Sequence, residues 1–553
     1  MKITSIPQIY RHVGRWGDIL SVLSKYELAA WVGRLGPKFA KGFLKTRAGD
    51  AIAGQPWETR VRLAMCELGP TFIKLGQVLS TRPDLAGVAL AEELQGLQAN
   101  VPADPPEVAR ATIERELGRP IEELFAEFDD QAIASASIGQ VHRATLPSGE
   151  AVVVKVQHAG IERKVAVDLD ILAGLAQLAE RNPDLRNYRP RAVVAEFQRV
   201  MRRELDFLRE QRNMEQFARN FAGNPHIRIP RSFPRLSTHR VLTMERIDGI
   251  KLAETDRLAG VAVDQEEIAR RGANLYLEML FQHGFYHADP HPGNIVLLDG
   301  GVIGLLDYGM VGRIDERLRD QVEEGLLAAV DRDAERLAAL LIHIGSPPRD
   351  LDRAGLSIDL TDFLAHYANQ PLDQFDLSGA LKEITEMVRR YGIMLPARVG
   401  MLIKVLVTLE GTSRMLSPSF SLAQIMEPYQ ATLRWHRISP TRRLRKTRRV
   451  IREFEHLIEA LPQGTMDILD QIQSGQFDVH LDHRGLEPSV NRLVLGMLAS
   501  ALFLGSALLL AHKVPPLVYG VSSLGAAGFV VSVGLGLRLL RAINKSGRLD
   551  RPK

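Results

Sequence analysis

Apolar residues recur at helical spacing through the first part of the chain. They do so over Glu27–Phe43, over Glu58–Leu79 and, more briefly, over Glu107–Leu117. Residues three or four positions apart share one face of an α-helix, so each run predicts a helix with one face to bury. We therefore expect residues 1–115 to form a helical N-terminal extension.

A strand-like period begins after about residue 132. Gln140–Leu146 and Ala151–Gln157 are apolar and β-branched, and a turn rich in Pro, Ser and Gly separates them, which predicts a β-hairpin. Later patterns predict helices over Val165–Glu180 and Arg191–Gln216, strands over Ile227–Pro230 and Arg240–Glu245, and mostly helix from Asp264 to about Leu461. This order predicts a small β-containing lobe over residues 116–250 and a larger helical lobe over residues 251–460.

The last part of the chain contains two long apolar segments. Leu493–Ala511 has 19 residues without a charge, and Val514–Leu537 has 24. At about 1.5 Å per residue, each can cross a hydrocarbon core of about 30 Å. We expect two transmembrane helices, 493–511 and 514–537, which form a hairpin behind a polar and basic linker over residues 461–492. A buried hairpin in a soluble core is the alternative.

Basic residues flank this hairpin on the side of the chain ends. Arg492 precedes it, and Arg538, Arg541, Lys545 and Arg548 follow it. Because basic flanks stay on the cytoplasmic side of a membrane, the lobes are expected in the cytoplasm. Gly528, Ser532 and Gly536 recur every four residues, which predicts a face for close helix packing.

Composition narrows the possible chemistry. The chain has 553 residues and one cysteine, Cys66, which excludes an internal disulfide and cysteine-based zinc or redox centres and indicates a reducing compartment. The net charge of +4 is too balanced to indicate nucleic-acid binding. A dense basic run precedes the apolar hairpin by about forty residues, and we favour contact with anionic lipid for it. A solvated helix face or a nucleic-acid patch is the alternative. The run comprises Arg442, Arg443, Arg445, Lys446, Arg448, Arg449 and Arg452.

Candidate catalytic residues are densest around residue 290. In HADPHPGN, Asp289 stands five residues before Asn294, and Asp307 follows thirteen residues later, after a predicted hairpin. This arrangement suits phosphoryl transfer, in which one carboxylate takes the acceptor's proton while an amide oxygen and a second carboxylate hold Mg²⁺ on ATP. His287 and His291 could ligate a metal, but we favour packing and hydrogen bonding within the loop.

A lysine and an unusual loop precede this segment. The strand VVVKV delivers Lys155 to a pocket, where its ammonium can bridge phosphates and be held by a glutamate. Residues 134–141 read ASASIGQV where a protein kinase would have a glycine-rich turn over the phosphates. Alanine adopts positive φ less freely than glycine, so we expect a stiffer loop and a different nucleotide pose. A plain Ala/Ser linker is the alternative.

Paired charges occur in the segment RELDFLRE. It contains Glu204, Asp206 and Glu210, and we favour Glu210 as the partner of Lys155, although a solvated charged helix has the same pattern.

The helical extension contains the segment KLGQ. Lys74 and Gln77 lie there at i, i+3 on either side of Gly76, a mid-helix glycine that indicates a close neighbour. This spacing does not distinguish a segment that serves tertiary packing from one that serves the function of the protein.

Six segments of the chain, followed by an apolar hairpin, resemble the motifs of the UbiB family of atypical kinase-like proteins. In chain order they are KLGQ, ASASIGQVHRA, VVVKVQ, RELDFLREQRN, HADPHPGN and DYG. The resemblance is dense from about Gly69 to Arg313 and looser beyond. It implies an α+β fold, bilobal and protein-kinase-like, that binds ATP with Mg²⁺. It also implies a part in ubiquinone biosynthesis at a bacterial inner membrane.

The resemblance implies roles for individual residues. Asp289 would be the catalytic aspartate, Lys155 the phosphate-binding lysine with Glu210 as its partner, and Asn294 and Asp307 the metal ligands. ATP would further contact Ile133, Ala134, Ser135, Ala136, Ser137, Ile138, Gly139, Gln140 and Val141. Lys74 and Gln77 would fold over the site near Glu204 and Asp206 and regulate it. Ser135 departs from an all-alanine loop, and its hydroxyl is expected to bond locally without loss of function.

Together these expectations describe a membrane-anchored kinase or ATPase whose acceptor is a protein, a small molecule or water. If Lys74 blocks the groove for a peptide, ATP would instead drive a conformational or lipid-handling step. Anionic lipid, isoprenoid quinone precursors and proteins of ubiquinone biosynthesis are the expected partners, and nucleic acid is not. A nucleotide-gated scaffold with little catalysis is the alternative. A phosphotransferase for a small alcohol or an antibiotic is disfavoured by the hairpin and the Lys74 segment.

Overall fold

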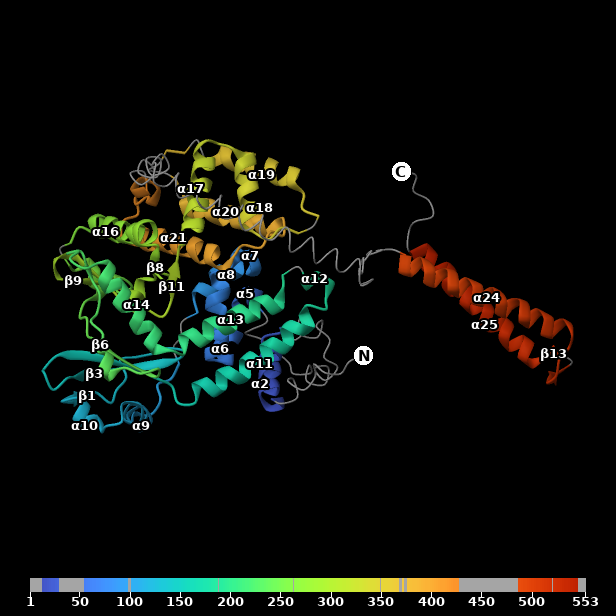
Figure 1. The fold of residues 1–553 in the computed structure, drawn as a ribbon, viewed down its shortest axis with the longest axis horizontal. Helices are drawn as coiled ribbons and strands as arrows, with labels where there is room; N and C mark the ends of the chain where they lie inside the picture. Colours follow the sequence, from blue (N-terminus) through green and yellow to red (C-terminus); the bar gives the residue numbers. More distant parts are fainter. Residues whose placement is uncertain are drawn as a thin grey trace, which may run out of the picture. The chain divides into compact units, whose positions relative to one another are not determined.

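The computed structural model describes most of the chain (Figure 1). The described residues are 12–28, 54–97, 101–186, 188–261, 263–348, 350–367, 370–371, 375–426, 486–519 and 521–545. They belong to two compact units, residues 1–438 and residues 439–553. The predicted basic run at 442–452 and the linker up to residue 485 lie outside the described residues.

The hairpin predicted between residues 140 and 157 is confirmed and lies at the centre of a five-stranded antiparallel sheet. Its strands are β1 (Glu127–Phe128), β2 (Ala134–Ser135), β3 (Gly139–Thr145), β4 (Ala151–Gln157) and β6 (Val241–Glu245). β3 pairs with β4, and Val141 lies opposite Lys155 in this register. Buried valines of β4 pack against α9 (Pro106–Leu117) and α10 (Ile121–Leu124), so the sheet carries its own small core.

The helix predicted over Arg191–Gln216 is wrong in one respect, because the chain forms two helices there. α13 (Pro190–Glu204) ends before Asp206, and α14 (Phe207–Asn220) begins after it. A tertiary contact causes the break. The amide of Phe207 donates to the carbonyl of His239 (3.0 Å), and the His239 ring lies 2.9 Å from the Asp206 carboxylate. The preceding helix is α11 (Ile161–Ala179), close to its predicted range.

Among the described residues from 264 to 426 the larger lobe is mostly helical, as predicted, around short strands, whereas the part of that prediction between residues 427 and 461 lies outside the described residues. Its strands are β5 (Ile227–Arg228), β7 (Ile250–Lys251), β8 (Phe285–His287), β9 (Ile295–Leu298), β10 (Val302–Leu305) and β11 (Val311–Arg313). Its longer helices are α16 (Gln265–Glu278), α17 (Glu316–Val330), α18 (Ala334–Ile344), α19 (Arg353–Tyr367), α20 (Leu377–Arg390) and α21 (Ala397–Leu416). The strands predicted at residues 227–230 and 240–245 belong to different sheets. β5 pairs with β10, whereas β6 pairs with β4.

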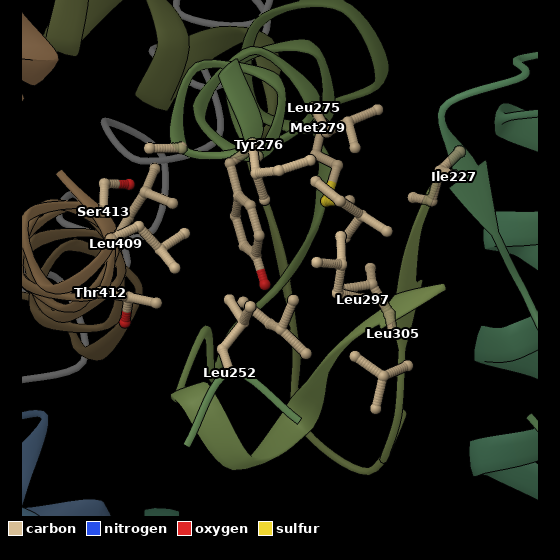
Figure 2. Close-up of a pocket in the computed structure, with 17 residues that line it drawn as sticks. Ile227, Leu252, Leu275, Tyr276, Met279, Leu297, Leu305, Leu409, Thr412 and Ser413 are labelled. Atoms are coloured by element: carbon tan, nitrogen blue, oxygen red, sulfur yellow. The ribbon is translucent and has the colours of Figure 1, made fainter. Parts of the chain in front are cut away.

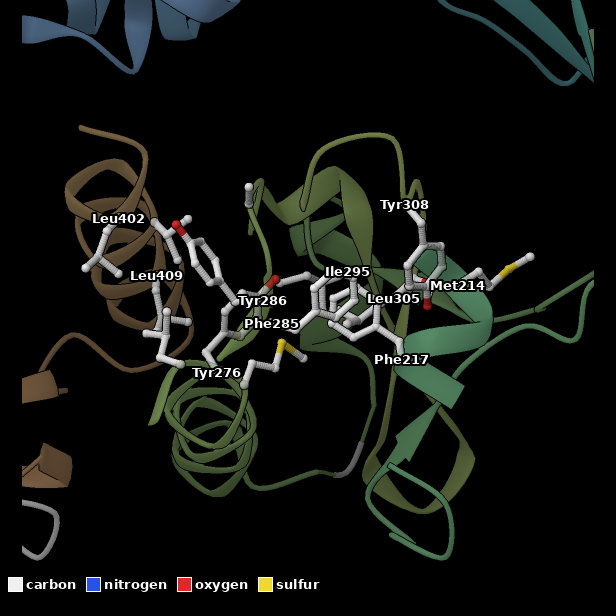
Figure 3. Close-up of a cluster of buried hydrophobic side chains, with 14 of the residues drawn as sticks. Met214, Phe217, Tyr276, Phe285, Tyr286, Ile295, Leu305, Tyr308, Leu402 and Leu409 are labelled. Atoms are coloured by element: carbon white, nitrogen blue, oxygen red, sulfur yellow. Dashed lines mark hydrogen bonds between the residues drawn. The ribbon is translucent and has the colours of Figure 1, made fainter. Parts of the chain in front are cut away.

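Aromatic side chains fix α14 to the larger lobe (Figure 3). The Phe217 ring of α14 lies 4.7 Å from that of Phe285 in β8 and 5.4 Å from that of Tyr308, centroid to centroid. Leu402 and Leu409 of α21 belong to the same buried cluster. One buried cluster therefore joins α14, β8 and α21.

The N-terminal extension differs in detail from the prediction. Its described helices are α2 (Val13–Lys25), α5 (Trp57–Leu68), α6 (Pro70–Ser80), α7 (Pro83–Ala86) and α8 (Val88–Gln95). The apolar run Glu58–Leu79 is split because Gly69 has φ +95° and Pro70 opens a new helix. Of the helix predicted over Glu27–Phe43, only residues 27 and 28 are described, and they form no helix.

Packing accounts for the glycine of the KLGQ segment. A Cβ on Gly76 would clash with Leu97 and Met65. α6 therefore packs closely on neighbouring helices of the extension at this point, in keeping with the close neighbour that the sequence indicated.

Buried ion pairs fasten the extension to both lobes. The Arg15 guanidinium lies 2.8 Å from the Asp168 carboxylate of α11, which is fully buried. Arg82 pairs with Asp84 and donates to the carbonyl of Leu395 (3.0 Å), just before α21. The extension is thus positioned by ion pairs whose carboxylates are buried, while the guanidinium side chains of Arg15 and Arg82 are 20% and 6% exposed.

The second unit contains two apolar helices, α24 (Leu486–Ala511) and α25 (Ser523–Lys545). Two segments, Leu493–Ala511 and Ser523–Arg541, are long and apolar enough to cross a membrane, and only 11% of each is buried. The second span was predicted to begin too early, because the helix begins at Ser523 and the described residues before it include the short strands β12 (Leu517–Val518) and β13 (Val521–Ser522).

The face predicted from small residues is only partly used in this helix pair. A Cβ on Gly528 would clash with the Ser506 hydroxyl of α24, so the two helices approach closely there. Ser532 is buried. Gly536 has no atom within 4 Å of where a Cβ would be, so it lies off the interface.

We predict that Arg82→Ala lowers the free energy of unfolding by about 3–5 kcal/mol, because Asp84 would stay buried without its partner. Denaturant unfolding of the full chain measures this. Arg257→Ala is the matched control, since its pair with Glu254 is exposed, and its cost should stay below about 1 kcal/mol. Equal losses for the two variants would contradict the prediction.

Candidate functional site

The loop between β8 and β9 is held by a buried histidine. His287 is fully buried, and its Nε2 lies 2.8 Å from the carbonyl oxygen of Asp307 and 3.0 Å from that of Leu306. Its Nδ1 accepts from the amide of Asp289 (3.3 Å). His287 therefore fixes the two acidic segments relative to each other, as the favoured loop role predicted. Among the described residues no group of three His, Cys, Asp or Glu is arranged to hold a metal.

Asp289 and Asn294 lie together on this loop. The Asn294 amide nitrogen donates to the Asp289 carboxylate (3.1 Å), which leaves the amide oxygen of Asn294 available. Lys404 of α21 donates to the other carboxylate oxygen of Asp289 (3.2 Å). Burial alone would raise the pKa of Asp289, but Lys404 and then His287 outweigh it and lower the pKa. Asp289 is therefore an ionised carboxylate at neutral pH.

Lys155 joins the small sheet to α14 and to the second acidic segment. Its Nζ lies 2.9 Å from both carboxylate oxygens of Glu210 and 3.6 Å from Asp307 Oδ1. The Phe207 ring lies 5.2 Å from the same nitrogen. Burial would lower the pKa of Lys155, but Asp307 and Glu210 outweigh it and raise the pKa, so the lysine stays charged.

Asp307 is the open carboxylate of this group. It has φ +55°, which turns the chain sharply after β10, and its side chain is 55% exposed. Lys155 is the main cause that lowers its pKa, against the effect of burial, and the amide of Gly309 donates to it (3.1 Å). Carboxylate and amide oxygens are the ligands that Mg²⁺ prefers, so Asp307 and Asn294 fit a magnesium site.

The alanine-rich loop is held by backbone hydrogen bonds to the neighbouring strand β3. Ala134 and Ser135 form β2 against β3, and the amide of Ala136 donates to the carbonyl of Gly139 (2.9 Å) across the turn. A Cβ on Gly139 would clash with the carbonyl of Val156, so only glycine fits there.

The ends of this loop are also anchored by side chains. The His158 ring lies 3.0 Å from the Ala136 carbonyl and 3.5 Å from the Ser135 hydroxyl, and the Gln140 amide oxygen accepts from the amide of Asp104 (2.6 Å). Ile138 is buried in the core, whereas Ile133 is 45% exposed. Not every residue of the predicted ATP-binding loop is therefore open to a ligand.

Lys74 reaches the site, but two of its predicted companions do not. Its Nζ lies 2.9 Å from the Glu204 carboxylate, and only 9% of the lysine side chain is exposed. Burial would lower the pKa of Lys74, but Glu204 outweighs it and raises the pKa. The Gln77 amide instead lies 3.4 Å from the Leu97 carbonyl. Asp206 faces His239 and Arg212 rather than Lys74.

Lys404 is the site residue that the sequence analysis missed. The only signal is one basic residue within the apolar helix segment MLIKVLV, more than a hundred residues after Asp289. A single lysine in such a helix more often points its amine to solvent, so the signal could not by itself indicate this contact.

An apolar cavity lies in the core of the larger lobe, apart from these charges (Figure 2). Tyr276, Leu297 and Leu409 are among its lining residues, and none of the residues predicted to bind nucleotide lines it. Apolar side chains without a converging set of charges do not suit a nucleotide, so we place the candidate site at Lys155 and Asp289.

Family models match three parts of the chain. Residues 96–341 match the ABC1 atypical kinase-like domain, residues 360–421 the UbiB helical domain, and residues 480–545 the ABC1/UbiB kinase-like C-terminal domain. The last match contains both apolar helices as far as residue 545.

Curated relatives align along most of their length. A Pseudomonas aeruginosa protein named "Probable protein kinase UbiB" is 34% identical over 454 residues, which cover 80% of this chain and 83% of the relative. An uncharacterized Synechocystis protein is 32% identical, covering 76% and 71% of the two chains. A Clostridium pasteurianum protein from a hydrogenase 1 5' region is 30% identical, covering 88% and 93%.

Among solved structures, the complex of Rv3197 with erythromycin from Mycobacterium tuberculosis is similar at 25% sequence identity and a TM-score of 0.47. The match covers 64% of this chain and 90% of that one.

The family matches and the identities of the relatives confirm the kinase-like α+β fold that the motifs predicted. The chain belongs to the UbiB family of atypical kinase-like proteins.

Proposed function

We propose that this protein is a membrane-anchored, Mg²⁺-dependent ATPase or kinase that supports ubiquinone biosynthesis. The observation that carries the proposal is that Lys155, from the small lobe, lies 3.6 Å from Asp307 of the larger lobe. His287 in turn ties the Asp307 backbone to the Asp289 loop. A strand lysine held by a helix glutamate, beside a catalytic aspartate and two metal ligands, is the set that phosphoryl transfer from ATP requires.

Each residue of this set has a role in the proposal. Lys155, kept in place by Glu210, binds the phosphates nearest the sugar. Asp307 and Asn294 hold Mg²⁺, which neutralises phosphate charge when bound. Asp289 orients the acceptor and takes its proton, because its lowered pKa leaves it ionised at neutral pH.

The extension supports water or a small molecule as the acceptor. Lys74 and Glu204 form a nearly buried pair, and Glu204 Oε2 would lie 3.6 Å from a Cβ on Gly309, beside Asp307. A helix of the extension therefore stands next to the acidic turn, where a peptide would have to approach. We propose that this contact regulates access to the site and hinders phosphorylation of other proteins.

One observation favours a second candidate, a nucleotide-gated scaffold with little catalysis. Both carboxylate oxygens of Asp289 are engaged, one by Asn294 and the other by Lys404. An acceptor would have to displace one of these donors before its proton could be taken. In the scaffold reading, ATP binding alone would change how the protein presents lipid precursors to other proteins of the pathway.

The C-terminal helices support a site of action at the bacterial inner membrane. Both candidate spans are apolar and largely unburied within the described residues. Isoprenoid quinone precursors carry long apolar tails that dissolve in a bilayer, and anionic lipid would suit the basic residues beside the hairpin. We propose that the kinase-like unit lies on the cytoplasmic side.

We predict that Asp307→Asn weakens Mg²⁺-dependent binding of ATP at least about tenfold, because an amide replaces a charged metal ligand. Isothermal titration of the full chain in detergent, with and without Mg²⁺, measures this. Asp299→Asn is the matched control, since Asp299 is exposed in the turn between β9 and β10. If Asp307→Asn binds Mg·ATP as tightly as the control, the assigned metal site is wrong.

We predict that Asp289→Asn keeps nucleotide binding but lowers ATP turnover by about 10²–10⁴-fold, as loss of a general base does. A bacterial strain lacking its own relative should then regain ubiquinone with the unchanged protein and accumulate a prenylated phenol with the variant. Quantifying both lipids is the measurement. Full rescue by Asp289→Asn would favour the scaffold.

We predict opposite accessibility for two turns when each carries the sole cysteine in a Cys66→Ser background. Tyr519→Cys, fully exposed between the apolar helices, should react with a membrane-impermeant maleimide in spheroplasts. Ser148→Cys, exposed in the turn between β3 and β4, should react only after lysis. The reverse pattern would invert the proposed topology, and equal labelling would contradict a membrane-spanning hairpin.

A further inference from the structure

A cluster of arginines lies at the junction of α13 and α14, beside β11. Its members, called here the arginine cluster, are Arg203 of α13, Arg209 and Arg212 of α14, and Arg313 of β11. Three of them are exposed and Arg209 is half-buried. The segment RELDFLRE therefore presents guanidinium groups to solvent, whereas its two glutamates pair with lysines of the candidate site.

These arginines have few carboxylates around them. Arg212 lies 3.2 Å from Asp206, but the other three form no ion pair with any residue that the structure describes. Burial lowers the pKa of Arg209, and the charges of the other three arginines lower it further, against the effect of Asp206. Like charges held this close repel one another, so an anion bound among them would relieve the repulsion.

Packing holds the cluster in place before any partner arrives. The Arg313 guanidinium lies 4.8 Å from the centroid of the Phe285 ring, and that ring lies 4.7 Å from the Phe217 ring of α14. At the start of α14 the amide of Arg209 donates to the carbonyl of Asp206 (2.9 Å). A surface that is ordered in advance loses less conformational entropy on binding.

The kind of cation indicates the kind of partner. α13 and α14 contain no lysine. A guanidinium donates two parallel hydrogen bonds to a planar carboxylate, whereas a lipid surface attracts lysine as well as arginine. The Asp206 carboxylate, 28% exposed, would repel a continuous anionic surface but can lie between the separate side chains of an acidic peptide.

We propose that the arginine cluster is a docking surface for an acidic segment of a partner protein, whose aspartates and glutamates pair with the guanidinium groups. Arg203 directly precedes Glu204, which pairs with Lys74, so a docked segment would lie next to the contact between the extension and the site. The inference goes beyond the proposed function, because docking requires no ATP turnover. Added salt should weaken docking, since the attraction is between exposed charges.

Binding of two labelled peptides to the full chain in detergent tests the proposal. One peptide alternates glutamate with alanine, and the other has glutamine in place of each glutamate. We predict that Arg209→Gln with Arg313→Gln lowers affinity for the glutamate peptide at least about tenfold, because charge-assisted hydrogen bonds are lost. Arg257→Gln with Arg270→Gln is the matched control, since it removes the same charge from exposed pairs elsewhere and should not change the affinity.

Charge reversal gives a readout that a merely structural effect would not produce. Arg209→Glu with Arg313→Glu should lose the glutamate peptide and gain binding of a peptide that has lysine at the same positions. The unchanged protein should bind this lysine peptide no better than the glutamine peptide. If the reversed variant fails to fold, Arg203→Gln with Arg212→Gln removes two exposed charges of the cluster and should weaken binding of the glutamate peptide.

The outcomes are distinguishable. If Arg209→Gln with Arg313→Gln binds the glutamate peptide as tightly as the control, the cluster is not the docking surface. If phosphatidylglycerol in the detergent micelles displaces the peptide from the unchanged protein, the cluster faces lipid and the inference is overturned as well. ATP turnover, measured on the same preparations, should not change between variants. Its absence from the unchanged protein would count against the proposed function and leave this inference standing.

Discussion

Pairing of buried lysines with carboxylates is the interaction on which this site depends. The pairs are Lys155–Glu210, Lys74–Glu204 and Lys404–Asp289. An ammonium group can leave water only if opposite charge and hydrogen bonds compensate it, so each pair demands a fixed geometry. Because the partners come from segments far apart in the chain, the pairs join the small sheet to α14, the extension to α13, and α21 to the loop between β8 and β9.

The excess of carboxylates over ammonium groups at this site favours a positively charged ligand. Four carboxylates, those of Glu204, Glu210, Asp289 and Asp307, are accompanied by three ammonium groups. One negative charge is left over, and the most exposed of these carboxylates is Asp307. This excess of negative charge would attract a divalent cation, and phosphate oxygens of a nucleotide could supply further ligands to it.

Local signals predicted the parts of the site that lie within one hairpin or one loop. Lys155 could be placed because a strand period, a turn and a second strand need only neighbouring residues. Helix ends were predicted less well. Asp206 interrupts a helical pattern because His239, more than thirty residues away, binds the backbone and side chain at the break. Periodicity carries no information about such a partner.

By itself, the sequence determined the two lobes, the apolar hairpin and the types of residue around the catalytic loop, since hydrophobic period and motif spacing are local properties. Only the tertiary structure decided which charges meet. It joined Lys74 to Glu204 but not to Asp206, and it brought Lys404 to Asp289. The reason is that the burial of a charge depends on every element packed around it, and this packing exists only once the chain has folded.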